Sequence, residues 1–454
     1  MIFADTDVGA AFGVTLISSD AMTRALTKWD NTFKGKPSWA KASDDIESIN
    51  MAKHIADTRA RLTMLDIGIS VSGSARADYL QTVADKLLAK LPEKLADANG
   101  LGGLLFRWNG KSWDFILPGD FGITSVDDDG NINGVILANH IEQNGAHYTR
   151  LEYHRFEGEG YMVTNKAFKN QTLGGETKLG REVPLTAVKE WADMAREATI
   201  QNIDGPLFGH FRVPGSNTVD RRSPLGLSVF ANAMHELKAI DIAVSRKDGE
   251  VEDSKHITFV GQQAVRSATQ QGIELPRFVK GLGVGLDDGE TKSIHEHVPT
   301  MLTEARIKDI NFNLSMAGVK CGFSEGVFVL DGQTGMITAT QVEADDRDTI
   351  QTIKADRDAL QNAVVQALKG ADVIATLYGQ APLGDYEVDF GFGDLTYSYE
   401  EDKQQWWKYV TQGDMPKWMY YVKFEKMSEE EAKKLIEEAR AEQQYEGIFD
   451  HLKQ

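Results

Sequence analysis

Apolar residues recur at helical spacing through much of the first hundred residues. The pattern predicts two helices between residues 20 and 65, with Met22, Leu26 and Trp29 on the apolar side of the first. The turn signal Gly35-Lys36-Pro37-Ser38-Trp39 separates them. A third helix is predicted from Asp78 to Leu95, and Pro92 lies near its end, where a helix stop is expected.

From Gly100 the pattern changes to short apolar runs separated by turns. Asn109-Gly110 and Asn144-Gly145 are typical hairpin signals between such runs. The predicted strands are 104–106, 113–118, 132–138, 147–153 and 161–164. Strands at this spacing favour an antiparallel meander.

After Pro224-Leu225-Gly226 the helical pattern returns and predicts a helix that ends near Asp248-Gly249. Its apolar stripe, which we expect to be buried against another helix or a second copy of the chain, consists of Leu227, Phe230, Met234, Leu237 and Ile240. Residues 250–299 indicate mixed β-structure and turns. A second helix is predicted from Thr300 to Ala317. Mixed elements of this kind indicate an α+β fold.

The segment from Gly318 to Val342 combines several signals. A helical pattern ends in glycines, and an apolar run at 327–330 predicts a short strand. The residues 331–335 form a turn signal, and Thr338-Ala339-Thr340 opens the longest predicted helix, which reaches Leu368 or beyond. The exposed face of that helix is predicted to be dense in Asp and Arg. Glycines 326, 332 and 335 permit unusual backbone conformations, so we expect residues 324–338 to be less ordered than the flanking helices.

The last 60 residues contain an aromatic cluster of Trp406, Trp407, Tyr409, Trp418, Tyr420 and Tyr421. It is either a platform for stacked bases or a packing cluster between two helices. The acidic run at 400–402 precedes it, which favours packing. Ser428 and Glu431 have the spacing of a capping box.

Composition narrows the function classes. The chain has 454 residues and a net charge of −19, so a general DNA-binding protein is not expected, because such proteins present a basic face. Acidity suits either a conduit through which DNA slides or simple solubility. Cys321 is the only cysteine, which excludes internal disulfides and cysteine metal clusters and fits folding in a reducing cytoplasm. No apolar run is long enough to span a membrane, and the N-terminus has no basic segment typical of a signal peptide.

Three patterns invite an enzyme or ligand hypothesis, and each has a simpler explanation. The run His295-Glu296-His297 places two imidazoles on one strand face, but no further ligand spacing accompanies it. The glycine-rich run 281–285 is followed by acidic residues that would repel phosphate. The acidic pairs at 127–128, 287–288 and 345–346 lie in turns or on a charged helix face. We therefore expect no catalytic, cofactor or metal site.

Several motifs together resemble the portal proteins of tailed bacteriophages, in the branch typical of Gram-positive hosts. The most specific match runs from Pro206 to Ile240 and includes Ser223-Pro224-Leu225-Gly226-Leu227-Ser228. The 29–39 segment is similar to the family's "W…Y-x-G-x-P-x-W", with Phe33 in place of tyrosine. The segment 148–154 is similar to its "LE-x-H" strand. Residues 338–342 resemble its "TATEV", with Gln341 replacing glutamate.

The resemblance implies an architecture. It consists of an α/β wing (1–224), stem helix 1 (225–248), a β-containing clip (249–299), stem helix 2 (300–320), a tunnel-loop region (321–340), a long kinked helix returning to the wing (341–384) and a helical crown (385–454). The tunnel-loop candidates are Ser324, Glu325, Gly326, Asp331, Gly332, Gln333, Thr334 and Gly335. The cations proposed to face the channel from the stem are Arg306 and Lys308.

The resemblance also implies a function without catalysis. Such a protein forms a homo-oligomeric ring, usually a dodecamer, at one capsid vertex of the virion, and is assembled in the bacterial cytoplasm. Double-stranded DNA passes through it in packaging and ejection. Its implied partners are the terminase large subunit, a head-completion (adaptor) protein, and the major capsid and scaffolding proteins; no membrane is involved. The alternatives are a different phage head protein and a carbohydrate-active or sugar-binding module built on the β-rich region.

Overall fold

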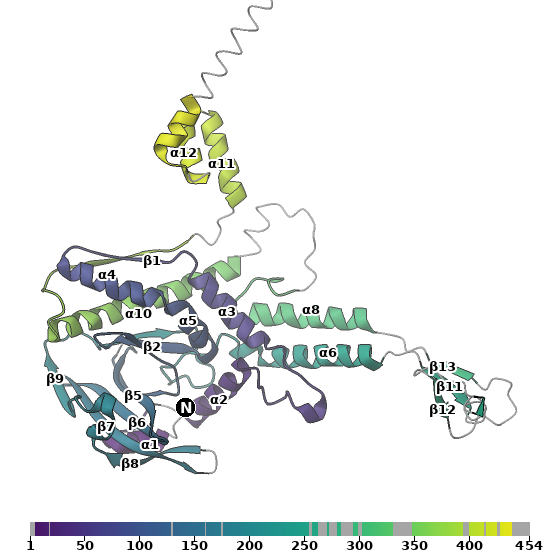
Figure 1. Cartoon of the computed structure of the whole chain (residues 1–454), viewed down its shortest axis with the longest axis horizontal. Coiled ribbons are helices and arrows are strands. Elements are labelled where there is room, and N and C mark those ends of the chain that lie inside the picture. The colour runs from purple at the N-terminus through teal and green to yellow at the C-terminus, as the bar shows by residue number, and fades with distance from the viewer. Residues whose placement is uncertain are drawn as a thin grey trace, which may run out of the picture. The chain divides into compact units, whose positions relative to one another are not determined.

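The computed structural model describes residues 5–17, 19–128, 130–158, 160–173, 176–253, 257–261, 270–271, 279–282, 294–297, 302–329, 347–393, 399–412, 415–424 and 427–437. Helices and strands are mixed along the chain, so the expected α+β class is confirmed (Figure 1). The chain divides into two compact units, residues 1–391 and 392–454. Glu387–Gly391 (β14), within the range that the resemblance assigns to the crown, belongs to the first unit, where it pairs with Gly68–Ser72 (β1).

The helices of the first layer of unit 1 are Asp20–Phe33 (α2), Met51–Thr63 (α3), Ala75–Leu88 (α4) and Leu91–Leu101 (α5). The short helix Asp5–Phe12 (α1) packs instead against the larger of the two sheets. The single helix predicted at 78–95 is in fact two helices, α4 and α5. Pro92 does not stop a helix but lies in the first turn of α5, where its missing N–H costs nothing. The two helices predicted between 20 and 65 are confirmed as α2 and α3.

Two antiparallel sheets form the second layer. The strands of the three-stranded sheet, in the order β10-β2-β3, are Gly209–Arg212, Gly103–Trp108 and Trp113–Ile116. The larger sheet has the strands Phe121–Val126 (β4), Ile132–Gln143 (β5), Ala146–Glu157 (β6), Gly160–Leu173 (β7) and Glu176–Val183 (β8), and Glu197–Gln201 (β9) also pairs with β7. The predicted strands at 132–138, 147–153 and 161–164 are confirmed as parts of β5, β6 and β7, which follow one another in the larger sheet, whereas those at 104–106 and 113–118 belong to the smaller sheet. The strands β4 and β8 extend the meander beyond the prediction.

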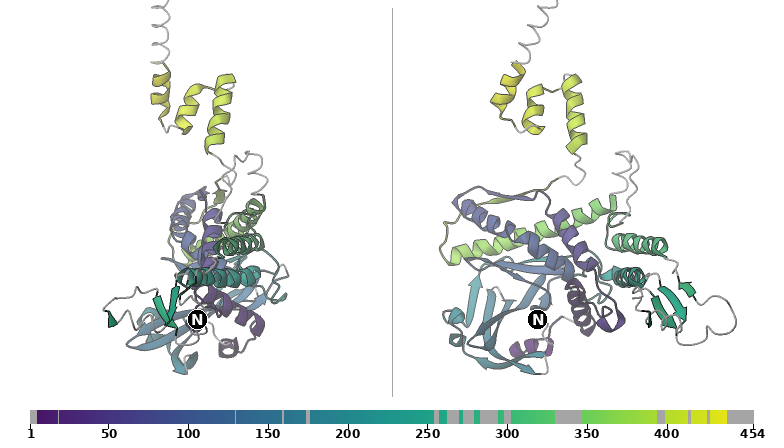
Figure 2. Two further views of the ribbon diagram at one scale, coloured as in Figure 1. Left: turned by 90° about the vertical axis from the view of Figure 1, so that its right-hand side faces the viewer. Right: turned by 45° about the vertical axis from the view of Figure 1, so that its right-hand side comes forward.

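The long helix Arg347–Leu377 (α10) packs across β10 and β2, which Figures 1 and 2 show in different views. The close approach of α10 to β10 depends on Gly209. A Cβ added at Gly209 would lie 2.0 Å from the carbonyl oxygen of Ala363, which no side chain tolerates. The predicted start of this helix, near Thr340, lies outside the described residues.

Two helices leave this body as a pair, Met234–Asp253 (α6) and Thr303–Lys320 (α8). The predicted start of the first, at 225–227, is wrong. Residues 227–230 are not helical, because Val229 N donates to Asn99 O at 2.9 Å and ties this segment to α5. The second helix is confirmed. Between them in the sequence lie the strands Ile257–Gly261 (β11), Val279–Leu282 (β12) and Ile294–His297 (β13), which form a three-stranded sheet.

Unit 2 contains the helices Tyr399–Gln412 (α11) and Lys417–Phe424 (α12), and residues 429–437 are helical as well. The aromatic cluster packs between helices, as predicted: ring centroids of Trp407 and Tyr420 are 5.1 Å apart, and those of Trp406 and Phe424 are 5.7 Å apart. The capping box is confirmed, because Glu431 N donates to Ser428 Oγ at 3.3 Å and Ser428 N donates to Glu431 Oε2 at 3.0 Å.

A buried histidine in the smaller sheet predicts how stability depends on pH. His210 Nε2 on β10 is buried without a hydrogen-bond partner among the described residues. Burial, with nearby Arg212, lowers the pKa of His210 to about 4. The unfolded chain takes up this proton near pH 6.5, before the folded chain does. The contribution of neutral His210 to the free energy of unfolding is therefore fully present above pH 6.5. It is lost as the pH decreases toward 4, and the loss reaches about 3 kcal/mol.

We expect His210→Gln to flatten this decline, measured by urea unfolding at pH 7.5, 5.5 and 4.5. His147→Gln is the matched control, because the His147 side chain is 58% exposed. An equally steep decline in His210→Gln and in the unmodified protein would contradict this assignment.

Candidate functional site: the α6–α8 helix pair and its base

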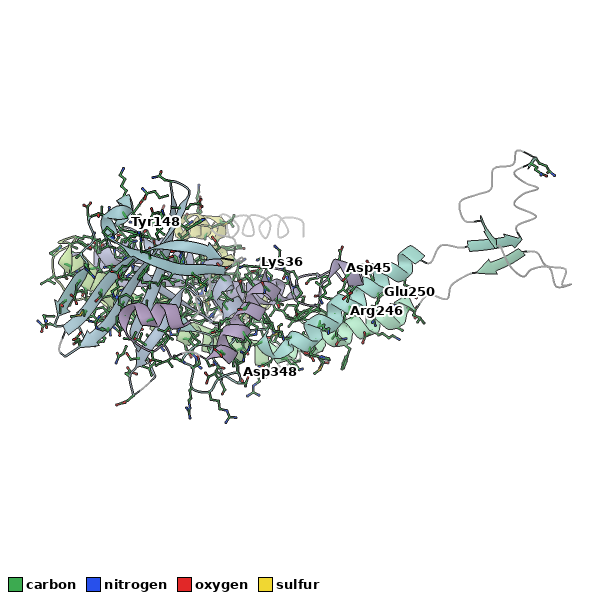
Figure 3. All side chains as sticks on the ribbon, turned by 90° about the horizontal axis from the view of Figure 1, so that it is seen from below. Lys36, Asp45, Tyr148, Arg246, Glu250 and Asp348 are labelled. Atoms are coloured by element: carbon green, nitrogen blue, oxygen red, sulfur yellow. The ribbon has the colours of Figure 1, made fainter. Side chains whose placement is uncertain are left out.

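Helices α6 and α8 run antiparallel, and an ion pair joins them toward each end. Near the start of α6, Glu236 Oε1 accepts a hydrogen bond of 2.7 Å from Lys320 Nζ in the last turn of α8. Toward the other end, Glu250 accepts from Arg306 Nε and, at 2.6 Å, from Leu302 N. Figure 3 shows Arg246 and Glu250 along this part of α6.

Both carboxylates are ionised at neutral pH. Burial raises the pKa of Glu236, but the hydrogen bond and charge of Lys320 outweigh it, so the net shift is downward. Hydrogen bonds from Leu302 N and Arg306 lower the pKa of Glu250. The two pairs fix how far one helix can slide along the other.

The predicted apolar stripe lies largely inside the chain itself. Phe230, Leu237 and Ile240 are buried in the main core, together with Ile310, Leu314 and Ala317 of α8. Leu227 and Met234 are half-buried and pack against the same core. Because Leu227 and Phe230 precede α6, they anchor its base rather than line its length.

The outer face of α8 is different. Phe312 is 64% exposed and Val319 is 47% exposed, seven residues further along the same helix face. Val327, in the turn that follows α8, is also exposed. Large apolar side chains gathered on one face of a surface helix are typical of an interaction surface.

The two cations predicted to face a channel have different roles. Arg306 is held by Glu250, so its charge is largely neutralised within the chain. Lys308 is exposed on α8. Only Lys308 therefore offers its charge to solvent.

The base of α6 is fixed by the segment that precedes α3. Trp39 Nε1 donates to Asp241 Oδ2 at 2.8 Å, and Ile49 N donates to Asp241 Oδ1 at 3.0 Å. Glu47 N donates to Ser245 Oγ at 3.0 Å, one turn further along. The tryptophan of the 29–39 motif thus serves as a hydrogen-bond donor to the helix pair.

The end of α8 is fixed by a buried ion pair between α3 and α10. Arg59 donates to both carboxylate oxygens of Asp356, at 2.6 and 2.8 Å, and its third contact is the carbonyl of Cys321 at 3.2 Å. Arg357, the next residue of α10, donates to the carbonyls of Leu62, Thr63 and Leu65 at the end of α3. Asp356 and Arg357 are buried, so the expectation of a charged, solvated face is wrong at these two positions.

The tunnel-loop candidates separate into two groups. Asp331, Gly332, Gln333, Thr334 and Gly335 lie outside the described residues. Ser324 is buried, and its Oγ contacts Thr349 Oγ1 of α10 at 3.0 Å, whereas Glu325 and Gly326 are exposed. The strand predicted at 327–330 is not formed at 327–329, because Val329 N donates to Gly326 O at 3.1 Å in a turn. Phe328 packs edge-on against Phe323, with ring centroids 5.0 Å apart.

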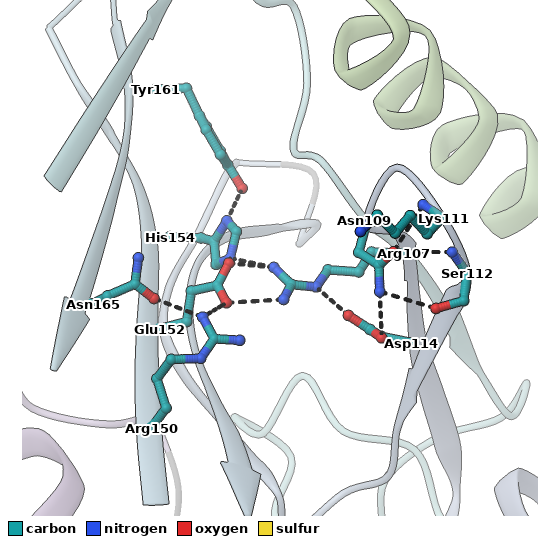
Figure 4. A network of polar contacts seen from close by, with 10 residues as sticks. All are labelled: Arg107, Asn109, Lys111, Ser112, Asp114, Arg150, Glu152, His154, Tyr161 and Asn165. Carbon is teal, nitrogen blue, oxygen red and sulfur yellow. Dashed lines mark hydrogen bonds and ion pairs between the residues drawn. The ribbon is translucent and has the colours of Figure 1, made fainter. Parts of the chain in front are cut away.

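A second group of buried polar residues lies between the two sheets, around the "LE-x-H" motif (Figure 4). Glu152 on β6 accepts from Arg107 of β2 at 2.8 Å and also from Arg150. His154 Nε2 lies 2.9 Å from Glu152, and His154 Nδ1 lies 3.0 Å from the Tyr161 hydroxyl.

The charges of this network are fixed by its surroundings. Burial raises the pKa of Glu152, but Arg107 and Arg150 outweigh it and hold that pKa well below its usual range. Burial lowers the pKa of His154 and raises that of Tyr161. Glu152 remains ionised while His154 and Tyr161 remain neutral at neutral pH, and the network joins the two sheets through Arg107 and Glu152.

The other chemical candidates are a histidine pair and an acidic turn. Asp127 of the acidic pair at 127–128 accepts from Asn131 N at 2.7 Å and so serves to close the turn. His295 and His297 lie on β13, opposite Phe259 and Ile257 of β11. No group of three or more His, Cys, Asp or Glu side chains suited to a metal occurs in the described part of the chain. Likewise, none of the helices among the described residues has the length and apolarity needed to cross a membrane. No family model matches the sequence, and no curated protein matches it.

The Arg59–Asp356 pair generates a stability prediction. Asp356→Asn leaves a buried guanidinium without its counter-charge, so we expect a loss of about 3 kcal/mol in the free energy of unfolding, measured with urea. The double change Arg59→Met with Asp356→Leu should recover most of this loss, because it removes both buried charges. If Asp356→Asn unfolds at the same urea concentration as the unmodified protein, the pair does not hold the base of α8.

Proposed function

We propose that this chain is a portal-type protein: a ring subunit that surrounds a channel for double-stranded DNA at one capsid vertex. The portal architecture named above is part of this proposal. The observation that carries it is the antiparallel α6–α8 pair, braced by ion pairs toward both ends and presenting an apolar outer face on α8. In a ring, each copy would contribute such a helix pair to the wall of the channel.

Closure of a ring requires two different surfaces on each copy. Head-to-tail contact of one patch with another generates a ring when the rotation closes. The outer face of α8, with Phe312 and Val319, supplies one apolar patch. The exposed residues of α6 include His235, Lys238, Arg246 and Asp248, and those of α8 include Glu304, Lys308 and Asp309. Charged side chains of both signs are thus available on both helices, which suits packing of α8 of one copy against α6 of the next.

The same features suit weak contact with a passing duplex. The net charge of −19 per copy disfavours tight binding of phosphates. The internal pairing of Arg306 with Glu250 removes one candidate phosphate contact, and Lys308 remains. In this proposal the terminase large subunit, the head-completion protein, and the capsid and scaffolding proteins are partners of the assembled ring.

Phe312→Asp tests the assembly surface. Because Phe312 is exposed in the single chain, we expect the variant to fold but to lose ring formation, measured by size-exclusion chromatography with light scattering. Leu383→Asp is the control, since Leu383 is 78% exposed outside the helix pair and should leave assembly intact. Leu237→Asp is a poorer test, because Leu237 is buried within the chain and its change would disrupt folding. A Phe312→Asp protein that still forms rings of normal size would refute this assembly surface, and an unmodified protein that stays monomeric would refute the ring.

A salt titration tests the conduit. We expect purified rings to bind a labelled duplex weakly at low salt, with a shallow dependence on salt concentration, because few phosphates are neutralised. Lys308→Glu should weaken this residual binding further. Tight binding at low salt that falls steeply as salt rises would show a basic, gripping channel instead.

A further inference from the structure

A pocket of about 360 Å³ opens where α3, the segment before α6, the end of α8 and α10 meet. Its wall comes from the loop after β10, the segment before α6, the end of α8 and one face of α10. The side chains that matter to its chemistry are Arg59, Ser216, Ser228, Asn232, Lys320 and Thr352. It is distinct from the exposed face of α8 and from the network around Glu152.

The charged residues that line this pocket are both basic. They are Arg59 and Lys320, in a chain whose net charge is −19. Each is held by a carboxylate that is not among the lining residues: Asp356 binds Arg59 at 2.6 Å and Glu236 binds Lys320 at 2.7 Å. The acidic partners fix the cations and offset much of their charge, so the pocket wall offers charged N–H donors beside hydroxyl groups.

A second, independent observation indicates a missing acceptor. Ser228 lines the pocket and is 3% exposed, and its hydroxyl has no hydrogen-bond partner among the described residues. A buried donor of this kind is destabilising unless an acceptor is supplied. A ligand oxygen is the simplest group to supply it.

The backbone shapes the wall beside Thr352. Gly322 has φ +82°, and a Cβ there would lie 2.6 Å from Thr352 Oγ1. Glycine is therefore required to bring the end of α8 this close to α10. The close approach places the threonine in the same wall as Lys320.

We propose that this pocket binds a compact oxyanion, either a phosphate or a carboxylate group. Arg59 and Lys320 supply charged N–H donors beyond those given to their carboxylates, and the Ser228 and Thr352 hydroxyls supply neutral donors, which together suit tetrahedral or planar oxygen acceptors. The source is a free small anion or an acidic side chain of a second copy of the chain. The site does not depend on the proposed channel function.

The test titrates the full-length protein with inorganic phosphate and, separately, with acetate, at constant ionic strength maintained with NaCl. Isothermal calorimetry should detect saturable binding of one anion per chain. Lys320→Gln should weaken it at least tenfold. Because this change leaves Glu236 without its counter-charge, the double variant Glu236→Gln with Lys320→Gln repeats the test with the pair neutralised together.

Two further variants assign the effect to the pocket. Ser228→Ala should weaken binding severalfold while leaving the anion-free protein as stable as before, or more stable, because it removes an unpaired donor. Lys369→Gln removes the same charge from an exposed position of α10 outside the pocket and should bind normally. Absence of saturable binding to either anion, or equal binding by the unmodified protein and both Lys320 variants, would overturn the proposal.

A last arm distinguishes the two sources. If the natural occupant is a carboxylate of a second copy, saturating phosphate should dissociate oligomers that NaCl at the same ionic strength leaves intact. If the occupant is a free anion, the molar mass measured by light scattering should not change while phosphate binds. Either result supports the pocket and identifies what fills it.

Discussion

The buried pair between Arg59 and Asp356 is the contact on which the arrangement of unit 1 depends. It joins α3 to α10, residues 297 apart in the sequence, and the same guanidinium holds the carbonyl that ends α8. A buried pair adds little net stability, because both ions lose their hydration, but separating them is strongly unfavourable. The pair therefore selects one arrangement of three helices. With that arrangement fixed, the direction in which the α6–α8 pair leaves the body follows.

The two ion pairs between α6 and α8 are less buried, and they also fix the position of one helix relative to another. Glu236–Lys320 lies at the base of the pair, and Glu250–Arg306 lies toward the other end. Exposed pairs of this type contribute little energy individually, yet two of them separated along a helix define register. Because the apolar stripe of α6 is satisfied inside the chain, the exposed Phe312 and Val319 remain available for contacts with other molecules.

The sequence predicted those elements whose signals are local. The periods of α2, α3 and α8 and of the strands β5 to β7 are strong enough to identify each element, and the capping box at Ser428 needs only two residues. The predictions that the structure contradicts concern residues whose partners are distant in the sequence. The start of α6 was misplaced because Val229 bonds to Asn99, and the roles of Asp356 and Arg357 were missed because charged residues on a helix normally face water. The pocket lined by Ser228 and Lys320 combines five separate segments, and no spacing rule relates them.

The pairing of β1 with β14 has a consequence for how the chain folds. Gly68 pairs with Gly391, so the first unit cannot close until nearly all of its sequence has left the ribosome. Contacts between residues so distant in sequence form slowly, because the intervening loop must close first. During that interval β1 lacks its partner strand and Arg59 of α3 lacks Asp356, while α3 can already pack against α5 and α2. Completion of the body is thus the late step of folding, and the base of the α6–α8 pair is finished only with it.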